Sequence, residues 1–135
     1  MRVILDTNVF VSGVFFSGPP FEILCSWRDG RLQLVASAEI LEEYRRVGER
    51  LQAGLSGTAF SQILVLVALH CEVVLPIDLA EPICDDSTDD KFFACAIAAG
   101  YPTIVSGDKH LHRANGYGGI KVYRPREFME RFLVS

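Results

Sequence analysis

The chain opens with an apolar run that shows no polar alternation. Residues 3–5 read Val-Ile-Leu, and the run stops at the ionisable residue Asp6. An antiparallel strand with one wet face would alternate apolar and polar residues, whereas a strand covered on both faces by helices is apolar throughout. The opening therefore favours a parallel sheet inside a three-layer α/β/α domain.

Segments of strand and helix character alternate along the rest of the chain. After residues 2–5, further strands are predicted over 32–35, 72–75, 103–106 and 121–123. Helices are predicted over 19–27, 38–51 with Ser37 as N-cap, 58–69, 89–99 and 125–132. The pattern assigns no element to residues 7–16. This order predicts an α/β fold with a mainly parallel sheet of four to five strands, in a single domain over residues 1–135.

Composition limits the classes of protein that need to be considered. Half of the 135 residues are hydrophobic and 22% are charged, which is typical of a folded globule. The net charge of −4 argues against a general nucleic-acid binder, although acidic residues gathered in a metal site could account for the excess of negative charge. Cys25, Cys71, Cys84 and Cys95 form no C-x-x-C pair and no zinc pattern, which favours reduced thiols. No apolar run is long enough for a signal peptide or a membrane span, so we expect a cytoplasmic protein without a membrane partner.

Four acidic residues occupy positions that an α/β domain would bring to one edge of its sheet: Asp6, Glu43, Asp89 and Asp108. Asp6 and Asp108 each follow a predicted strand, and ligands of such sheets bind beyond the carboxyl ends of the strands. A carboxylate resists burial unless something compensates its charge. The alternatives are a loop cap formed by Asp6 or Thr7, and a solvated turn at Asp108.

Helix geometry separates the two glutamates of the predicted helix over 38–51. At about 100° per residue, Glu43 borders the apolar stripe of this helix, whereas Glu42 points away from it. Glu43 is therefore the better candidate ligand. The alternative is an ordinary solvated glutamate paired with Arg46.

Residues 85–90 contain four aspartates in six positions. Helix capping and the helix dipole account for two acids at such a place, and four repel one another. Asp89 opens the apolar stripe of the following helix, so it is the expected ligand, with Asp86 or Asp90 in an accessory role.

Oxygen ligands of this kind suit Mg²⁺ or Mn²⁺ rather than zinc. Converging carboxylates repel strongly unless a cation lies between them, and one or two such ions can activate water for phosphodiester hydrolysis. Lys91, Lys109 and Arg113 are candidates for orienting a phosphate backbone. No P-loop or G-x-G-x-x-G pattern is present.

Taken in order, four motifs of the chain resemble the PIN domain family, over essentially its whole length. They are Val3-Ile4-Leu5-Asp6-Thr7-Asn8, Ser37-x-x-Ile40-Leu41-Glu42-Glu43-Tyr44, Asp86-x-x-Asp89-Asp90-Lys91, and Ile104-Val105-Ser106-Gly107-Asp108. The nearest resemblance is to the prokaryotic PIN proteins that act as toxins of toxin–antitoxin pairs, the VapC-like ribonucleases.

The resemblance implies a Mg²⁺- or Mn²⁺-dependent ribonuclease that cuts single-stranded RNA. It carries the catalytic and metal-binding role onto Asp6, Glu43, Asp89 and Asp108, and a supporting role onto Thr7, Asn8 and Ser106. It also implies a homodimer and inhibition by a small antitoxin protein. The chain departs from the family at His110, where many members carry an acid.

Two other functions compete with this interpretation. A haloacid-dehalogenase-type phosphatase also begins with a strand that ends in aspartate, but it needs a second aspartate two positions on, where this chain has Asn8. A PIN module that binds RNA or protein without catalysis would have lost one or more of the acids, and all four are present.

Overall fold

The computed structural model describes residues 1–54 and 59–133. Within them, five parallel strands form one sheet in the order β3-β2-β1-β4-β5. The strands are β1 (Arg2–Leu5), β2 (Gln33–Ala36), β3 (Glu72–Val73), β4 (Thr103–Val105) and β5 (Val122–Tyr123). The expected α/β fold with a parallel sheet is confirmed, and every strand of it lies where the sequence predicts one.

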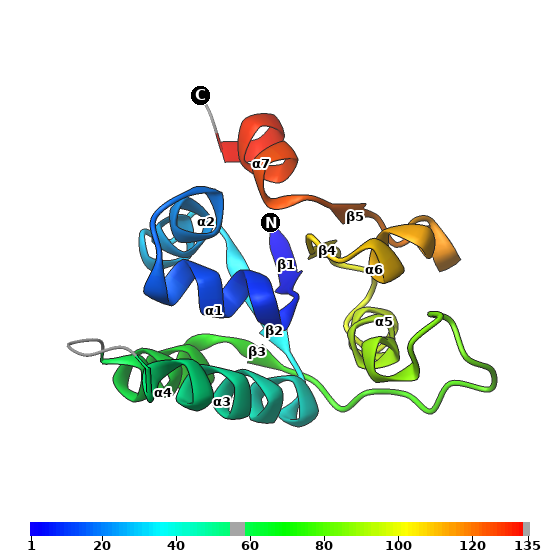
Figure 1. Cartoon of the computed structure of the whole chain (residues 1–135). Helices are drawn as coiled ribbons and strands as arrows, with labels where there is room; N and C mark the ends of the chain where they lie inside the picture. Colours follow the sequence, from blue (N-terminus) through cyan, green and yellow to red (C-terminus); the bar gives the residue numbers. More distant parts are fainter. Residues whose placement is uncertain (55–58, 134–135) are drawn as a thin grey trace.

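Helices connect the strands and cover the sheet. In chain order they are α1 (Thr7–Phe15), α2 (Pro19–Arg28), α3 (Ala38–Gln52), α4 (Phe60–His70), α5 (Asp90–Ala98), α6 (Lys109–Arg113) and α7 (Pro125–Phe128). Short 3₁₀ turns cover Ser87–Asp89 and Tyr117–Gly119, and a π-helical turn, Met129–Leu133, follows α7. Helices α1 and α2 lie on one side of the strands and α5 on the other, which gives the three-layer arrangement (Figure 1).

The predicted helices agree with the observed ones apart from two omissions. Ser37 caps α3 as expected, because its hydroxyl accepts a hydrogen bond of 3.3 Å from the backbone N–H of Ile40. The predicted start of the third helix, at residue 58, lies outside the described residues. Helices α1 and α6 have no counterpart in the sequence prediction, and both begin directly after an aspartate of the proposed edge.

The core between the sheet and α1, α3 and α4 is built around aromatic rings. Phe10 stacks on Tyr44 with ring centroids 4.3 Å apart, and Phe60 packs edge-on to Phe10 at 6.1 Å. Tyr44 also donates a hydrogen bond of 2.5 Å from its hydroxyl to the carbonyl of Leu5. This bond ties α3 to the end of β1, because a buried hydroxyl needs a partner.

The sheet has a topological switch point between β1 and β4. From β1 the chain moves outward to β2 and β3, and it then crosses to the other side of β1 to form β4 and β5. Leu5 pairs with Val105, so β1 and β4 end at the same level. Ligands of open α/β sheets bind at such a point, beyond the carboxyl ends of the strands.

No single helix among the described residues is long and apolar enough to cross a membrane; α1 and α2 meet the length and composition criteria only as a pair, bent by 86°.

Candidate metal site at the acidic edge

The ends of β1 and β4 bring Asp6, Ser106 and Asp108 together. The Ser106 hydroxyl donates a hydrogen bond of 2.7 Å to Oδ2 of Asp6 and accepts one of 2.9 Å from the backbone N–H of Asp108. Asp6 is only 5% exposed and Ser106 is fully buried. Asp6 stands at the N-cap of α1 but makes no capping hydrogen bond, so helix capping does not explain this carboxylate.

Asp108 lies at the sheet edge and is also the N-cap of helix α6. Its carboxylate accepts a hydrogen bond of 2.7 Å from the backbone N–H of His110 and caps the short helix α6. An aspartate has several lone pairs, so this single bond leaves it able to accept others. Asp108 is half-buried and begins a helix, and in this respect it differs from the solvated turn that the sequence left as the alternative.

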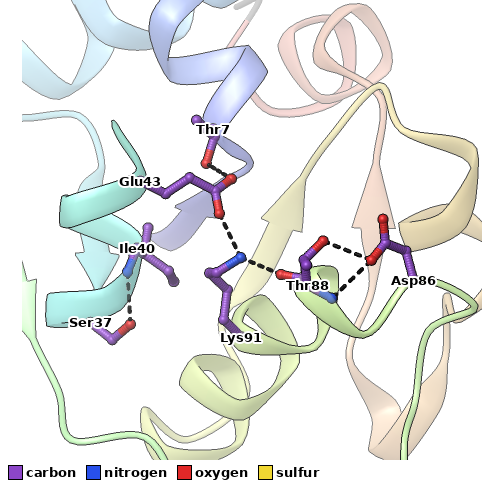
Figure 2. Close-up of polar contacts among 7 residues, drawn as sticks. All are labelled: Thr7, Ser37, Ile40, Glu43, Asp86, Thr88 and Lys91. Carbon is purple, nitrogen blue, oxygen red and sulfur yellow. Dashed lines mark hydrogen bonds and ion pairs between the residues drawn. The ribbon is translucent and has the colours of Figure 1, made fainter. Parts of the chain in front are cut away.

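Glu43 faces the same edge from α3. Oε1 of Glu43 accepts a hydrogen bond of 2.6 Å from the Thr7 hydroxyl (Figure 2). The neighbouring Tyr44 fixes the rotation of α3 by its bond to Leu5, and this turns Glu43 towards β1. Glu42 points to solvent and pairs with Arg45. Of the two glutamates, Glu43 is therefore the one that faces the edge, and its ionic partner is Lys91 and not Arg46. We name the four acids Asp6, Glu43, Asp89 and Asp108 together the acidic edge.

The four aspartates of residues 85–90, just before and at the start of α5, differ in what their carboxylates bind. Asp85 pairs with Arg113 at 2.7 Å, and Asp86 accepts hydrogen bonds from the backbone and hydroxyl of Thr88. Asp90 accepts the backbone N–H groups of residues 83 and 84 and so fastens the preceding loop. Among the described residues, Asp89 is the member of this group whose carboxylate has no hydrogen-bond donor. The expected ligand is thus the one that remains uncommitted, while Asp86 and Asp90 order the loop around it.

Lys91 places a positive charge inside this edge. Its Nζ lies 2.5 Å from Oε2 of Glu43, and the side chain of Lys91 is only 9% exposed. The same ammonium donates a hydrogen bond to the carbonyl of Thr88 (Figure 2). The sequence indicated Lys91 as a phosphate-orienting cation and did not indicate this pair, since nothing local relates residues 43 and 91.

The carboxylates of the acidic edge repel one another. The pKa of Asp6 rises from 3.8 to about 6, first because the group is buried and then because Asp108 and Glu43 are near, although the Ser106 hydroxyl opposes the rise. The pKa of Asp89 also rises to about 6, through burial and then through Asp108 and Asp6. Mutual elevation of carboxylate pKa values marks a place where a cation would be stabilised.

The donor set suits a hydrated Mg²⁺ or Mn²⁺. Every candidate ligand is a carboxylate oxygen, the kind that these ions prefer. In the described part of the chain, no three His, Cys, Asp or Glu side chains converge closely enough to form a ready-made cage. Mg²⁺ retains several waters and is commonly held by only one or two carboxylates, so it does not require such a cage. The acids therefore fit the ion as a loose oxygen site.

A pH dependence follows from the raised pKa of Asp6. The folded protein holds this proton up to about pH 6, whereas the unfolded chain loses it near 3.8. Asp6 therefore costs stability as the pH rises through that window. We expect Asp6→Asn to raise the free energy of unfolding of the metal-free protein by about 1–3 kcal/mol at pH 7 and by almost nothing at pH 4.

Urea unfolding in EDTA at pH 4, 5.5 and 7 measures this difference. Asp78→Asn, in an exposed loop, is the matched control and should change stability little at every pH. A stabilisation by Asp6→Asn that is equally large at pH 4 and pH 7 would contradict the assignment.

The remaining candidates lie around the edge without entering it. Arg113 is tied to Asp85, and Lys109 and Asn8 are exposed on the first turns of α6 and α1. His110 lies 3.7 Å from Asp85, with its Nδ1 buried and without a hydrogen bond. The four cysteines are free, and burial raises the pKa of the Cys84 and Cys95 thiols to about 12, which makes them poor nucleophiles.

The chain is similar to two solved structures and to one protein-family model. The solved structure of VapBC2 from Rickettsia felis, bound to a DNA fragment from their promoter, matches with a TM-score of 0.53 and 17% identity, over 92% of this chain and 98% of that one. FitAB bound to an IR36 DNA fragment gives a TM-score of 0.47 and 19% identity, over 91% and 94% of the two chains. No curated protein sequence matches. The family model described as PIN domain matches residues 2–110. The chain belongs to the PIN domain family.

Proposed function

We propose that the protein is a Mg²⁺- or Mn²⁺-dependent endoribonuclease that hydrolyses phosphodiester bonds of single-stranded RNA in the cytoplasm. The observation that carries the proposal is the meeting of Asp6 and Asp108 on Ser106 at the switch point of the sheet, where nearby carboxylates and burial raise the pKa of Asp6 and of Asp89 to about 6. Membership of a family whose members are generally nucleases supports the same conclusion.

Asp6, Asp89 and Asp108 would hold the ion, and Glu43 would bind it directly or through water. A divalent ion bound there would lower the pKa of a water and neutralise charge that develops on the phosphate. Ser106 orients the Asp6 carboxylate by its hydrogen bond, and Thr7 orients Glu43. Lys109 is exposed beside the edge, where it can contact the phosphate backbone of an incoming strand.

The proposed biological role is that of a toxin inhibited by an antitoxin protein. A surface suited to a protein partner lies on α2 and α4, where Phe21, Val65, Leu66 and Leu69 are 41–71% exposed. An apolar groove of about 210 Å³ runs between these helices. This face can take either an antitoxin segment or a second copy of the chain, and a homodimer is part of the proposal. Size-exclusion chromatography with light scattering, on wild type and Leu69→Lys, tests the homodimer.

Cleavage of a labelled single-stranded RNA tests the activity. We expect cutting in Mg²⁺ or Mn²⁺, none in EDTA, and recovery when metal is added back. Double-stranded RNA and single-stranded DNA of the same sequence are the comparison substrates, and both should be cut more slowly. A folded protein that neither cuts RNA nor binds metal would instead be the non-catalytic binding module.

A further inference from the structure

Lys91 is an ammonium group almost removed from solvent at the acidic edge. Its side chain is 9% exposed, and its Nζ has three partners: Oε2 of Glu43 at 2.5 Å, the Thr88 carbonyl, and the Phe92 ring at 5.4 Å from the centroid. Burying an ammonium is expensive unless it is paired and hydrogen-bonded. These contacts compensate the burial and fix the charge in one position.

Lys91 and Thr7 together engage both oxygens of Glu43. The Thr7 hydroxyl binds Oε1 and the Lys91 ammonium binds Oε2, and the Glu43 side chain is 19% exposed (Figure 2). Asp89 differs in this respect, because no donor among the described residues binds its carboxylate. Two of the four acids in the edge are thus in opposite states, one neutralised by the chain itself and one not.

A divalent ion could bind Glu43 directly only against the charge of Lys91. The ammonium that attracts the Glu43 carboxylate repels a divalent cation placed beside it, and this repulsion is stronger in a part-buried place than in water. The lone pairs that remain on Glu43 can still accept a hydrogen bond from water.

We propose that Lys91 is a positioning residue that occupies the place of a second divalent cation, so that the protein binds a single ion through Asp6, Asp89 and Asp108. Glu43, held by Lys91 and Thr7, acts on that ion only through water. This inference rests on the proposed metal-dependent function and specifies the number of ions and the role of Glu43.

Titration of Mn²⁺ tests the inference without any activity measurement. Calorimetry and electron paramagnetic resonance would be run on metal-free wild type, Lys91→Met and Lys91→Arg. Met keeps most of the length of the side chain and removes its charge, whereas Arg keeps the charge. We expect a single Mn²⁺ per chain for wild type and Lys91→Arg. Lys91→Met should bind a second ion, or bind the first on the order of tenfold more tightly.

Each outcome decides the inference, and the failures can be told apart. If wild type and Lys91→Met bind a single ion with the same affinity, the role of Lys91 is overturned and the proposed function stands. Binding of two ions by wild type has the same two consequences. Binding by Lys91→Met alone overturns both the inference and the proposed function, because each requires an ion in wild type. No binding by any of the proteins overturns both.

Glu43→Gln provides a second test if Lys91→Met does not fold. Substitution of a residue that acts through water typically lowers metal affinity about 10–100-fold, so Glu43→Gln should still bind a single Mn²⁺. Asp108→Asn is the comparison variant and should lose binding to a greater extent. Loss of Mn²⁺ by Glu43→Gln as complete as that of Asp108→Asn would show direct ligation and overturn the inference.

Discussion

Asp6→Asn is expected to lower kcat/KM for RNA cleavage at least about 10²-fold, because it removes a charged ligand from the centre of the acidic edge. Asn preserves the size of the side chain and can still accept the hydrogen bond from Ser106. The fold should therefore be intact, and in the absence of metal it should be more stable than wild type at pH 7. Loss of activity together with gain of stability distinguishes a chemical role from a structural one.

Single-turnover cleavage of a labelled RNA in Mn²⁺ measures the effect, with Asp78→Asn as the control variant in an exposed loop. The control should cleave at the wild-type rate. Wild-type cleavage by Asp6→Asn would remove Asp6 from the mechanism.

Phe60→Ala is expected to destabilise the protein by about 3–5 kcal/mol, the usual cost of deleting a fully buried aromatic ring. Phe60 is 1% exposed and stacks on Phe15 with centroids 5.5 Å apart. Its ring also lies against Gly48 of α3, where an added Cβ would come within 1.9 Å of a ring atom. The ring thus fills a space that only glycine leaves open, and its loss leaves a cavity between α3 and α4.

Thermal unfolding would show this as a fall in Tm of roughly 10–20 °C. Phe16→Ala is the matched control, because Phe16 is 53% exposed and its deletion leaves no cavity. Equal shifts for the two variants would contradict the packing of Phe60 described above.

Local sequence signals predicted those parts of the fold that local physics determines. The unalternated run at residues 3–5 indicated a covered parallel strand, and Ser37 indicated the start of α3. Helix α1 was not predicted because its buried residues include the β-branched Val9 and Val11, which favour strands, and because it follows Asp6 without a capping bond. Helix α6 has only five residues, too few for a periodic pattern.

In the candidate site, too, the features set by local geometry were predictable and those set by tertiary contacts were not. The rotation of α3 could be calculated from helix geometry, so the orientation of Glu43 was predictable. Which aspartate of residues 85–90 stays uncommitted depends on contacts with the loop backbone and with Arg113. The Glu43–Lys91 pair joins α3 to α5, and its two residues are 48 positions apart in the sequence. Such partners are set by tertiary packing, and no local pattern reports them.

The account rests on the acidic edge as the place where a divalent ion is held, and calorimetric titration of Mn²⁺ into metal-free protein tests this most directly. Wild type and Asp89→Asn would be compared at pH 7, with Asp78→Asn as control. We predict saturable binding to wild type and to the control, and its loss in Asp89→Asn. Absence of binding to wild type, or equal binding to Asp89→Asn, would contradict the account.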